Sequence, residues 1–182
     1  MAGLTRYLSC RLKLKVNEAK SAVGRPWERK FLGFSFSRRG FKLCVSNAAE
    51  KRFKEKIRET TGRTRGRSIR QVVREVREYL LGWNNYFGHS ELRSGFKELD
   101  SWIRRRLRSY LWKQWGRRGY RELRKRGVSR QLAWNTAKSA HGPWRLSRSP
   151  ALAIALPGRY FDGLGVPRLY IKRSSRPNRL ST

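Results

Sequence analysis

A regular spacing of apolar residues between positions 69 and 83 constrains the fold of this chain more than any other feature. Apolar side chains recur there every three or four residues, which places them along one stripe of an α-helix. The stripe consists of Ile69, Val72, Val73, Val76, Tyr79, Leu80 and Trp83. The pattern starts near Ser68 and runs out near Gly88, so we expect one long amphipathic helix that must bury its stripe against neighbours.

Two segments with the same period flank this helix and supply such neighbours. Ser46 or Asn47 can cap the first segment, in which Ala49, Phe53 and Ile57 share one face. The second covers residues 96–115, and its expected core face consists of Leu99, Ile103, Leu107, Tyr110 and Leu111. From the helical repeat, its far side carries Arg104, Arg105, Arg108, Trp112 and Trp115. Shorter helices are expected around 120–126 and 129–139.

The first 46 residues have strand character instead. Residues 12–16 alternate apolar and basic side chains, and residues 31–36 and 41–45 also read as strands, joined by a basic turn that makes them a hairpin. We therefore predict a mainly α-helical chain with a small β-hairpin. Its expected parts are 1–46 with the hairpin, a three-helix domain over 47–116, an extension with short helices over 117–170, and a disordered basic tail over 171–182.

The charge of the chain indicates what it binds. Lys and Arg number 45 against 12 Asp and Glu, a net charge of +33, and such a protein repels itself unless it meets a polyanion. Most of these cations are arginines, whose planar guanidinium groups fork onto phosphates and also stack on bases. Seven Trp, seven Tyr and eight Phe are too many for a solvated basic tail, so the chain can bury a core.

Residues for metal-assisted or covalent chemistry are few. The only aspartates, Asp100 and Asp162, lie in segments with no shared motif; Asp100 suits an ion pair with Arg104 and Asp162 suits a turn. His89 and His141 cannot form a zinc site, and Cys10 and Cys44 lack metal-ligand spacing. We expect no metal, no cofactor, no enzymatic activity of the chain as it stands, and a reducing, cytoplasmic location. No apolar run approaches the roughly 20 residues that span a membrane.

The cations and indoles that remain are suited to RNA, because arginines contact phosphates and tryptophans stack on unpaired bases. The candidate contact residues are Arg63, Arg65 and Arg67 in the loop 62–68, Arg104, Arg105 and Arg108 on the helix 96–115, Lys51, Lys54 and Arg58 on the first helix, and Trp112 and Trp115. Each cation could also be only a solvated charge. The loop lacks an apolar anchor, so we expect it to be mobile. Trp112 and Trp115 either form a stacking pair or pack against the C-terminal segment, including Trp144.

Several segments together resemble the C-terminal part of bacterial group II intron-encoded reverse transcriptase/maturases. Residues 12–20 and 31–36 are similar to the last palm strand of that family and to the hairpin that joins palm to thumb. Further similar segments are residues 52–54, 67–68 with 82–87, 99–107, 111–115 and 142–147. The resemblance implies a thumb-like, three-helix maturase domain, called domain X, that grips intron RNA and helps it fold for splicing.

The chain departs from that family in its N-terminal part. The family carries fingers and a palm with a Tyr-Ala-Asp-Asp motif, and nothing like it occurs here. We expect a truncated member, in which the apolar faces of 12–16 and 31–36 lack a neighbouring sheet and are partly exposed. Two alternatives remain open: a thumb subunit that completes a separate fingers–palm chain, and a remnant that binds RNA only through its charge.

Overall fold

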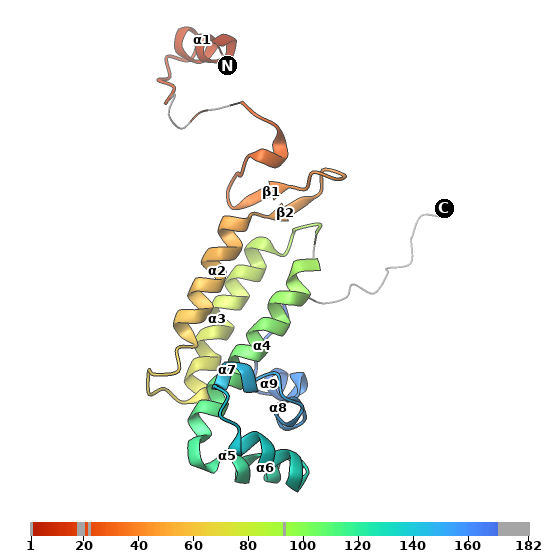
Figure 1. The fold of residues 1–182 in the computed structure, drawn as a ribbon. Helices are drawn as coiled ribbons and strands as arrows, with labels where there is room; N and C mark the ends of the chain where they lie inside the picture. Colours follow the sequence, from red (N-terminus) through yellow and green to blue (C-terminus); the bar gives the residue numbers. More distant parts are fainter. Residues whose placement is uncertain (1, 18–20, 22, 93, 171–182) are drawn as a thin grey trace, which may run out of the picture.

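The computed structural model describes residues 2–17, 21, 23–92 and 94–170. It is mainly helical and has one two-stranded antiparallel hairpin near the N-terminus (Figure 1), so the predicted fold class is confirmed. The predicted tail, 171–182, lies outside the described residues. The division of the chain into four parts stays a prediction.

The N-terminal part is only partly as expected. A helix, α1 (Ala2–Cys10), and a short 3-10 helix, η1 (Pro26–Glu28), precede the hairpin, and the sequence pattern indicated neither. The predicted hairpin is confirmed: β1 (Phe34–Phe36) pairs with β2 (Leu43–Val45). The predicted strand at 12–16 is wrong, because those residues have no strand structure. Alternating side chains provide one apolar face, but a strand also needs a partner backbone to pair with.

The apolar side chains of this part are as exposed as the sequence predicted. Leu12 and Leu14 are 52% and 55% exposed, and Phe31 is 78% exposed. Phe34 is the exception, because its ring packs 5.0 Å from that of Phe87 and so attaches the hairpin to the helices. Gly33 lies at this contact with a positive φ of 82°, and a Cβ there would come within 3.0 Å of the Phe87 ring.

Three long helices, α2 (Asn47–Thr60), α3 (Ile69–Phe87) and α4 (Ser94–Trp115), run side by side (Figure 1). The predicted cap at Ser46 and the predicted start of the next helix near Ser68 are confirmed. The Ser46 hydroxyl accepts a hydrogen bond from the Ala49 amide, and Ser68 forms a reciprocal capping box with Gln71. The predicted stripes meet in one core, in which Phe53, Ile57, Val76, Leu80, Ile103 and Leu107 are fully buried.

The rest of the described chain consists of short helices gathered at the C-terminal end of α4 (Figure 1). After η2 (Gly116–Arg118) come α5 (Gly119–Lys125) and α6 (Arg130–Lys138), both close to their predicted positions. α7 (Pro143–Leu146), α8 (Pro150–Ala155) and α9 (Gly158–Gly163) follow. The hydrophobic core continues through them to Leu169, so the helices after α4 share one core with α2 and α3.

Candidate nucleic-acid interface

Arg104 is the first of four arginines on α4, and its predicted place on the far side of the helix is wrong. It is only 7% exposed. Its guanidinium lies 3.2 Å from Asp100 Oδ1 and 2.6 Å from Asp162 Oδ1. Because two carboxylates neutralise this arginine, Arg104 does not present a free charge to RNA.

The two aspartates converge on Arg104, although nothing in their sequence surroundings connects them. The predicted pair of Asp100 with Arg104 is confirmed, and Asp100 also accepts hydrogen bonds from the backbone amides of Leu169 and Tyr170. Asp162 is in α9 and pairs with Arg168 as well. A hydrogen bond from Arg168, and then one from Arg104, hold the pKa of Asp162 below its usual range. The aspartates thus fasten α9 and the following segment to α4.

Arg105, Arg106 and Arg108 have a different environment, because neutral groups hold them. Arg105 donates to Ser147 Oγ and to the Trp144 carbonyl, both at 3.2 Å. Arg106 donates to Thr61 Oγ1 at 2.6 Å, and Arg108 donates to the Leu156 carbonyl at 2.8 Å. Within the described part of the chain, no carboxylate forms an ion pair with any of the three. Their positive charges are therefore oriented but not neutralised.

Burial lowers the pKa of all three guanidinium groups, and the charges of neighbouring arginines lower it further. These neighbours are Arg148 for Arg105, Arg58 and Arg63 for Arg106, and Arg104 for Arg108. Arginines keep their protons at any physiological pH. The lowered pKa therefore reflects first the burial of these charges and then the repulsion from neighbouring arginines, and a bound anion would stabilise the charged form against both.

Two tryptophans lie among these cations, and together they form what we call the arginine–tryptophan cluster: Arg58, Trp102, Arg105, Arg106 and Trp144. The Arg105 guanidinium lies over the Trp144 ring at 3.7 Å. Arg106 lies 5.6 Å from the Trp102 ring and 5.9 Å from that of Trp144, and Arg58 lies 5.7 Å from Trp102. Contacts of this length fall within the range of cation–π attraction.

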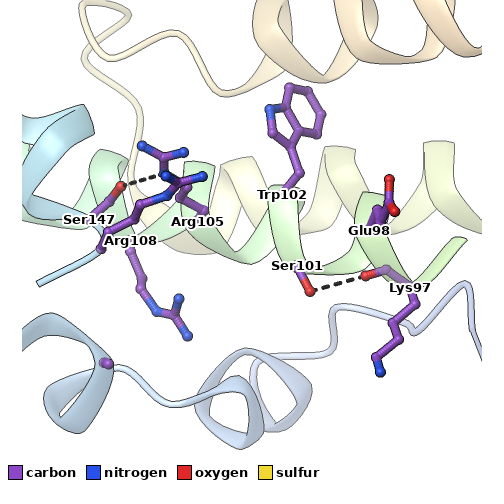
Figure 2. A pocket seen from close by; sticks show the side chains of 9 residues that line it. Lys97, Glu98, Ser101, Trp102, Arg105, Arg108 and Ser147 are labelled. Atoms are coloured by element: carbon purple, nitrogen blue, oxygen red, sulfur yellow. Dashed lines mark hydrogen bonds between the residues drawn. The ribbon is translucent and has the colours of Figure 1, made fainter. Parts of the chain in front are cut away.

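Two cavities open beside the cluster, and Trp102 lines both. The α4–α8 cavity, of about 680 Å³, is lined by Trp102, Arg105, Arg108, Lys97 and Arg148, with Glu98 as its acidic residue. Figure 2 shows Trp102, Arg105 and Arg108 projecting from α4, with Ser147 hydrogen-bonded to Arg105. The α2–α4 cavity, of about 300 Å³, is lined by Arg58, Arg63, Trp102, Arg106 and Trp144 together with Thr61 and Ser109.

Trp112 and Trp115 lie outside this cluster and pack against α5. Trp115 is 8% exposed and has the Arg126 guanidinium 4.6 Å from its ring. Trp112 is half-buried and so close to Gly119 that a Cβ there would lie 2.8 Å from the ring. Because Trp115 is buried, its ring is not accessible for stacking with a base. The packing partner of both rings is α5, whereas Trp144 contacts Arg105.

The loop 62–68 is anchored by polar contacts, although it has no apolar anchor. Arg63 donates to Ser109 Oγ at 3.4 Å, Arg65 pairs with Glu59, and Arg67 pairs with Glu75. The Arg67 carbonyl also accepts hydrogen bonds from Tyr110 and Gln114 on α4. Of the three loop arginines, Arg63 is the one that reaches the α2–α4 cavity.

The three candidate contact residues on α2 also differ in whether they pair with a carboxylate or line the α2–α4 cavity. Lys51 is exposed to solvent, and Lys54 forms an ion pair with Glu50 one turn away. Arg58 lies over Trp102 and lines the α2–α4 cavity. The structure thus brings Arg58, Arg63, Arg105 and Arg108 to one region, and it pairs Lys54, Arg65, Arg67 and Arg104 with carboxylates.

Sequence reasoning missed Trp102, Arg106 and Trp144 as candidate contact residues. Trp102 and Arg106 are four residues apart on α4, a spacing that places them on one helical face and could have identified them. No local spacing identifies Trp144, because it joins the cluster through α7 packing against α4.

Among the described residues, no three His, Cys, Asp or Glu side chains lie close enough together to hold a metal ion. No helix in the described ranges is both long and apolar enough to cross a membrane.

Comparison with known proteins agrees with the resemblance found in the sequence. Residues 50–128 match the family model described as the group II intron, maturase-specific domain. No curated protein matches the chain. The matched residues run from α2 through α5 and contain Arg58, Trp102, Arg105 and Arg106 of the cluster. The chain therefore carries, over residues 50–128, the maturase-specific domain of the group II intron family.

Proposed function

We propose that this chain binds folded group II intron RNA and assists its folding and splicing, without polymerase activity of its own. The observation that carries this proposal is the group Arg105, Arg106 and Arg108, whose guanidiniums are oriented by neutral acceptors and paired with no carboxylate of the described residues. Most other cations of the α2–α4 bundle that are held in place already have an acidic partner. Asp100 and Asp162 pair with Arg104, a structural use that leaves them poorly suited to hold catalytic metal ions.

The proposed mechanism is non-covalent. Folding of an RNA brings phosphates close together, and their repulsion opposes the compact form. Guanidinium groups that are already oriented lose little conformational freedom on contact, so they bind a closely packed set of phosphates better than a dispersed one. A protein with this preference shifts the RNA toward its compact form by the difference between the two affinities.

The test compares the full chain on a folded intron-like RNA and on an unrelated RNA of equal length, across a salt series. The first variant, Arg105→Gln with Arg108→Gln, removes two oriented charges of the α4–α8 cavity. Its matched control, Arg70→Gln with Arg74→Gln, removes two exposed charges on α3. We expect the first variant to lose about tenfold or more of the preference for intron RNA, and the control to lose affinity for both RNAs equally.

Arg105 and Arg108 also hold α7 and α8, so a second variant separates binding from folding. Lys97→Gln with Arg148→Gln removes two exposed charges that line the same cavity and hold no other element. This variant should melt like the wild type and still lose part of the preference. Equal binding of both RNAs by the wild type, with the same steep salt dependence, would contradict the proposal and favour the remnant that binds only through charge.

A second candidate function is that of a thumb subunit for a separate fingers–palm chain. The exposed apolar residues around the hairpin favour it: Phe31 is 78% exposed, Leu32 67% and Phe41 59%. The test adds a fingers–palm polypeptide and measures primer extension. Activity that depends on both chains and falls for Phe31→Ser would support this function, and no activity from the mixture would remove it.

A further inference from the structure

The charged side chains that line the α2–α4 cavity distinguish it from the rest of the proposed RNA-binding surface. It lies between the C-terminal end of α2 with its following loop, the middle of α4, and α7. Its charged lining residues are Arg58, Arg63 and Arg106, and no acidic residue of the described ranges lines it. With a volume of about 300 Å³ it is at the small end of the range for ligand sites, which suits one small anionic group and not a helix.

Two of the three arginines of this cavity, Arg106 and Arg63, are held by neutral groups. Arg106 donates to Thr61 Oγ1 at 2.6 Å and to the Arg58 carbonyl at 3.4 Å. Arg63 donates to Ser109 Oγ at 3.4 Å. Burial, and then the charges of Arg58 and Arg63, lower the pKa of Arg106. Three neighbouring cations, two of them fixed by hydrogen bonds, form a site for an anion with several acceptor oxygens, and a phosphate diester is such an anion.

The indoles of the cavity add a surface for a flat ring. Trp144 is already covered by Arg105 at 3.7 Å. The cations nearest to the Trp102 ring, Arg106 and Arg58, are 5.6 and 5.7 Å from its centroid, and the ring is only partly buried. Trp102 is therefore the ring in this cavity that is better placed to receive a base. Stacking on an indole tolerates any base, because every base has a π-face.

We propose that the α2–α4 cavity binds one unpaired RNA nucleotide, with its phosphate among Arg58, Arg63 and Arg106 and its base stacked on Trp102. The proposal rests on the RNA binding proposed above and adds the structural class of RNA that the site selects. A base inside a duplex is stacked on its neighbours and does not reach the cavity, whereas a bulged base is free to turn out. The site thus selects RNA helices interrupted by a bulge.

The experiment uses the full chain and three hairpin RNAs with the same stem. One hairpin is fully paired, one has a single-nucleotide bulge, and one has the same bulge with an abasic residue that keeps the phosphate and sugar. We expect the chain to bind the bulged hairpin about tenfold more tightly than the other two, the size that one stacked base provides. The variant Trp102→Leu should bind all three equally. Its matched control, Trp134→Leu, changes a ring on α6 that is 51% exposed and should keep the preference.

A second pair of variants tests the phosphate. Arg63→Gln should weaken binding of the bulged and abasic hairpins alike, and by more than Arg70→Gln, an exposed arginine on α3 whose loss removes only general charge. The proposal is overturned if wild-type protein binds the bulged and abasic hairpins equally, or if Trp134→Leu loses the preference as Trp102→Leu does.

These hairpins contain no intron sequence. A bulge preference without a preference for intron RNA would leave this inference standing and overturn the proposed maturase function; the reverse result would overturn this inference alone.

Discussion

Arg104 and Arg105 are neighbours in the sequence and have opposite environments in the structure. Arg104 is buried between Asp100 and Asp162, and Arg105 lies over the Trp144 ring with only neutral hydrogen-bond acceptors. Arg104 is therefore a structural residue that joins α4 to α9, and Arg105 is a candidate contact residue. At the residue scale, the presence of a carboxylate partner distinguishes the two roles.

The ion pairs of Asp162 lead to a prediction about acid stability. The pKa of Asp162 is held below its usual range by hydrogen bonds from Arg168 and Arg104, so the unfolded state binds its proton more readily than the folded state. The stability from this group is present above the ordinary aspartate pKa of about 3.9 and is lost as pH falls through the lower folded value. The melting temperature should therefore decrease as the pH is lowered below about 4.

The check is a melting curve at each pH from about 2 to 7 for the wild type and for Asp162→Asn. The variant should melt lower than the wild type at neutral pH, and the difference should shrink in acid as the wild-type carboxylate gains its proton. Glu55→Gln, an exposed change on α2, serves as control and should follow the wild type. A difference between Asp162→Asn and the wild type that stays constant with pH would contradict the prediction.

At the scale of elements, local signals in the sequence were enough for α2, α3 and α4. Each has an apolar stripe, and the first two begin at a serine cap. They were not enough to place α7, α8 and α9, each of which has a proline at its start. Pro143 and Pro150 lie in the first turn of α7 and α8, and Pro157 precedes α9, positions where a missing amide costs no hydrogen bond. A proline that starts a short helix and one that ends a helix look alike without the surrounding structure.

The capping box of α3 gives a prediction at this scale. In Ser68→Ala the Gln71 amide loses its acceptor and the reciprocal bond is weakened, so the free energy of unfolding should fall by about 1 kcal/mol. Urea denaturation measures this change. Ser101→Ala removes an exposed hydroxyl in the middle of α4 and should leave stability unchanged or slightly higher, because alanine is the better helix former. Equal effects of the two substitutions would show that the cap contributes nothing.

For the whole molecule, the hydrophobic core extends beyond the matched maturase-specific domain. The match ends at residue 128, and the core continues to Leu169. Several α4 arginines take their partners from this later segment: Asp162 for Arg104, Trp144 and Ser147 for Arg105, and Leu156 for Arg108. The residues after 128 therefore help to form the candidate interface as well as the core.

This continuity predicts the effect of truncation. A chain that ends at residue 128 should melt at a lower temperature than the full chain, because it exposes core side chains and leaves Arg104 with one carboxylate. It should also lose preference for folded RNA, because Trp144 is absent. Circular dichroism melting and the binding assay measure both effects. A chain that ends at residue 170 is the control and should keep the melting temperature and the RNA preference of the full chain; an unchanged melting temperature and preference in the 128-residue chain would contradict the prediction.

The sequence by itself determined the three long helices, the apolar stripes that they bury and the hairpin, and its charge predicts a polyanionic partner. It could do so because helix period, capping and net charge depend on residues close together in the chain or on composition alone. The tertiary structure alone decided which candidate cations are already paired with carboxylates, and that Trp102 and Trp144 lie among the others. The deciding partners are distant in sequence, 58 positions for Arg104 with Asp162 and 39 for Arg105 with Trp144, and only the packing of α7, α8 and α9 on α4 brings them together.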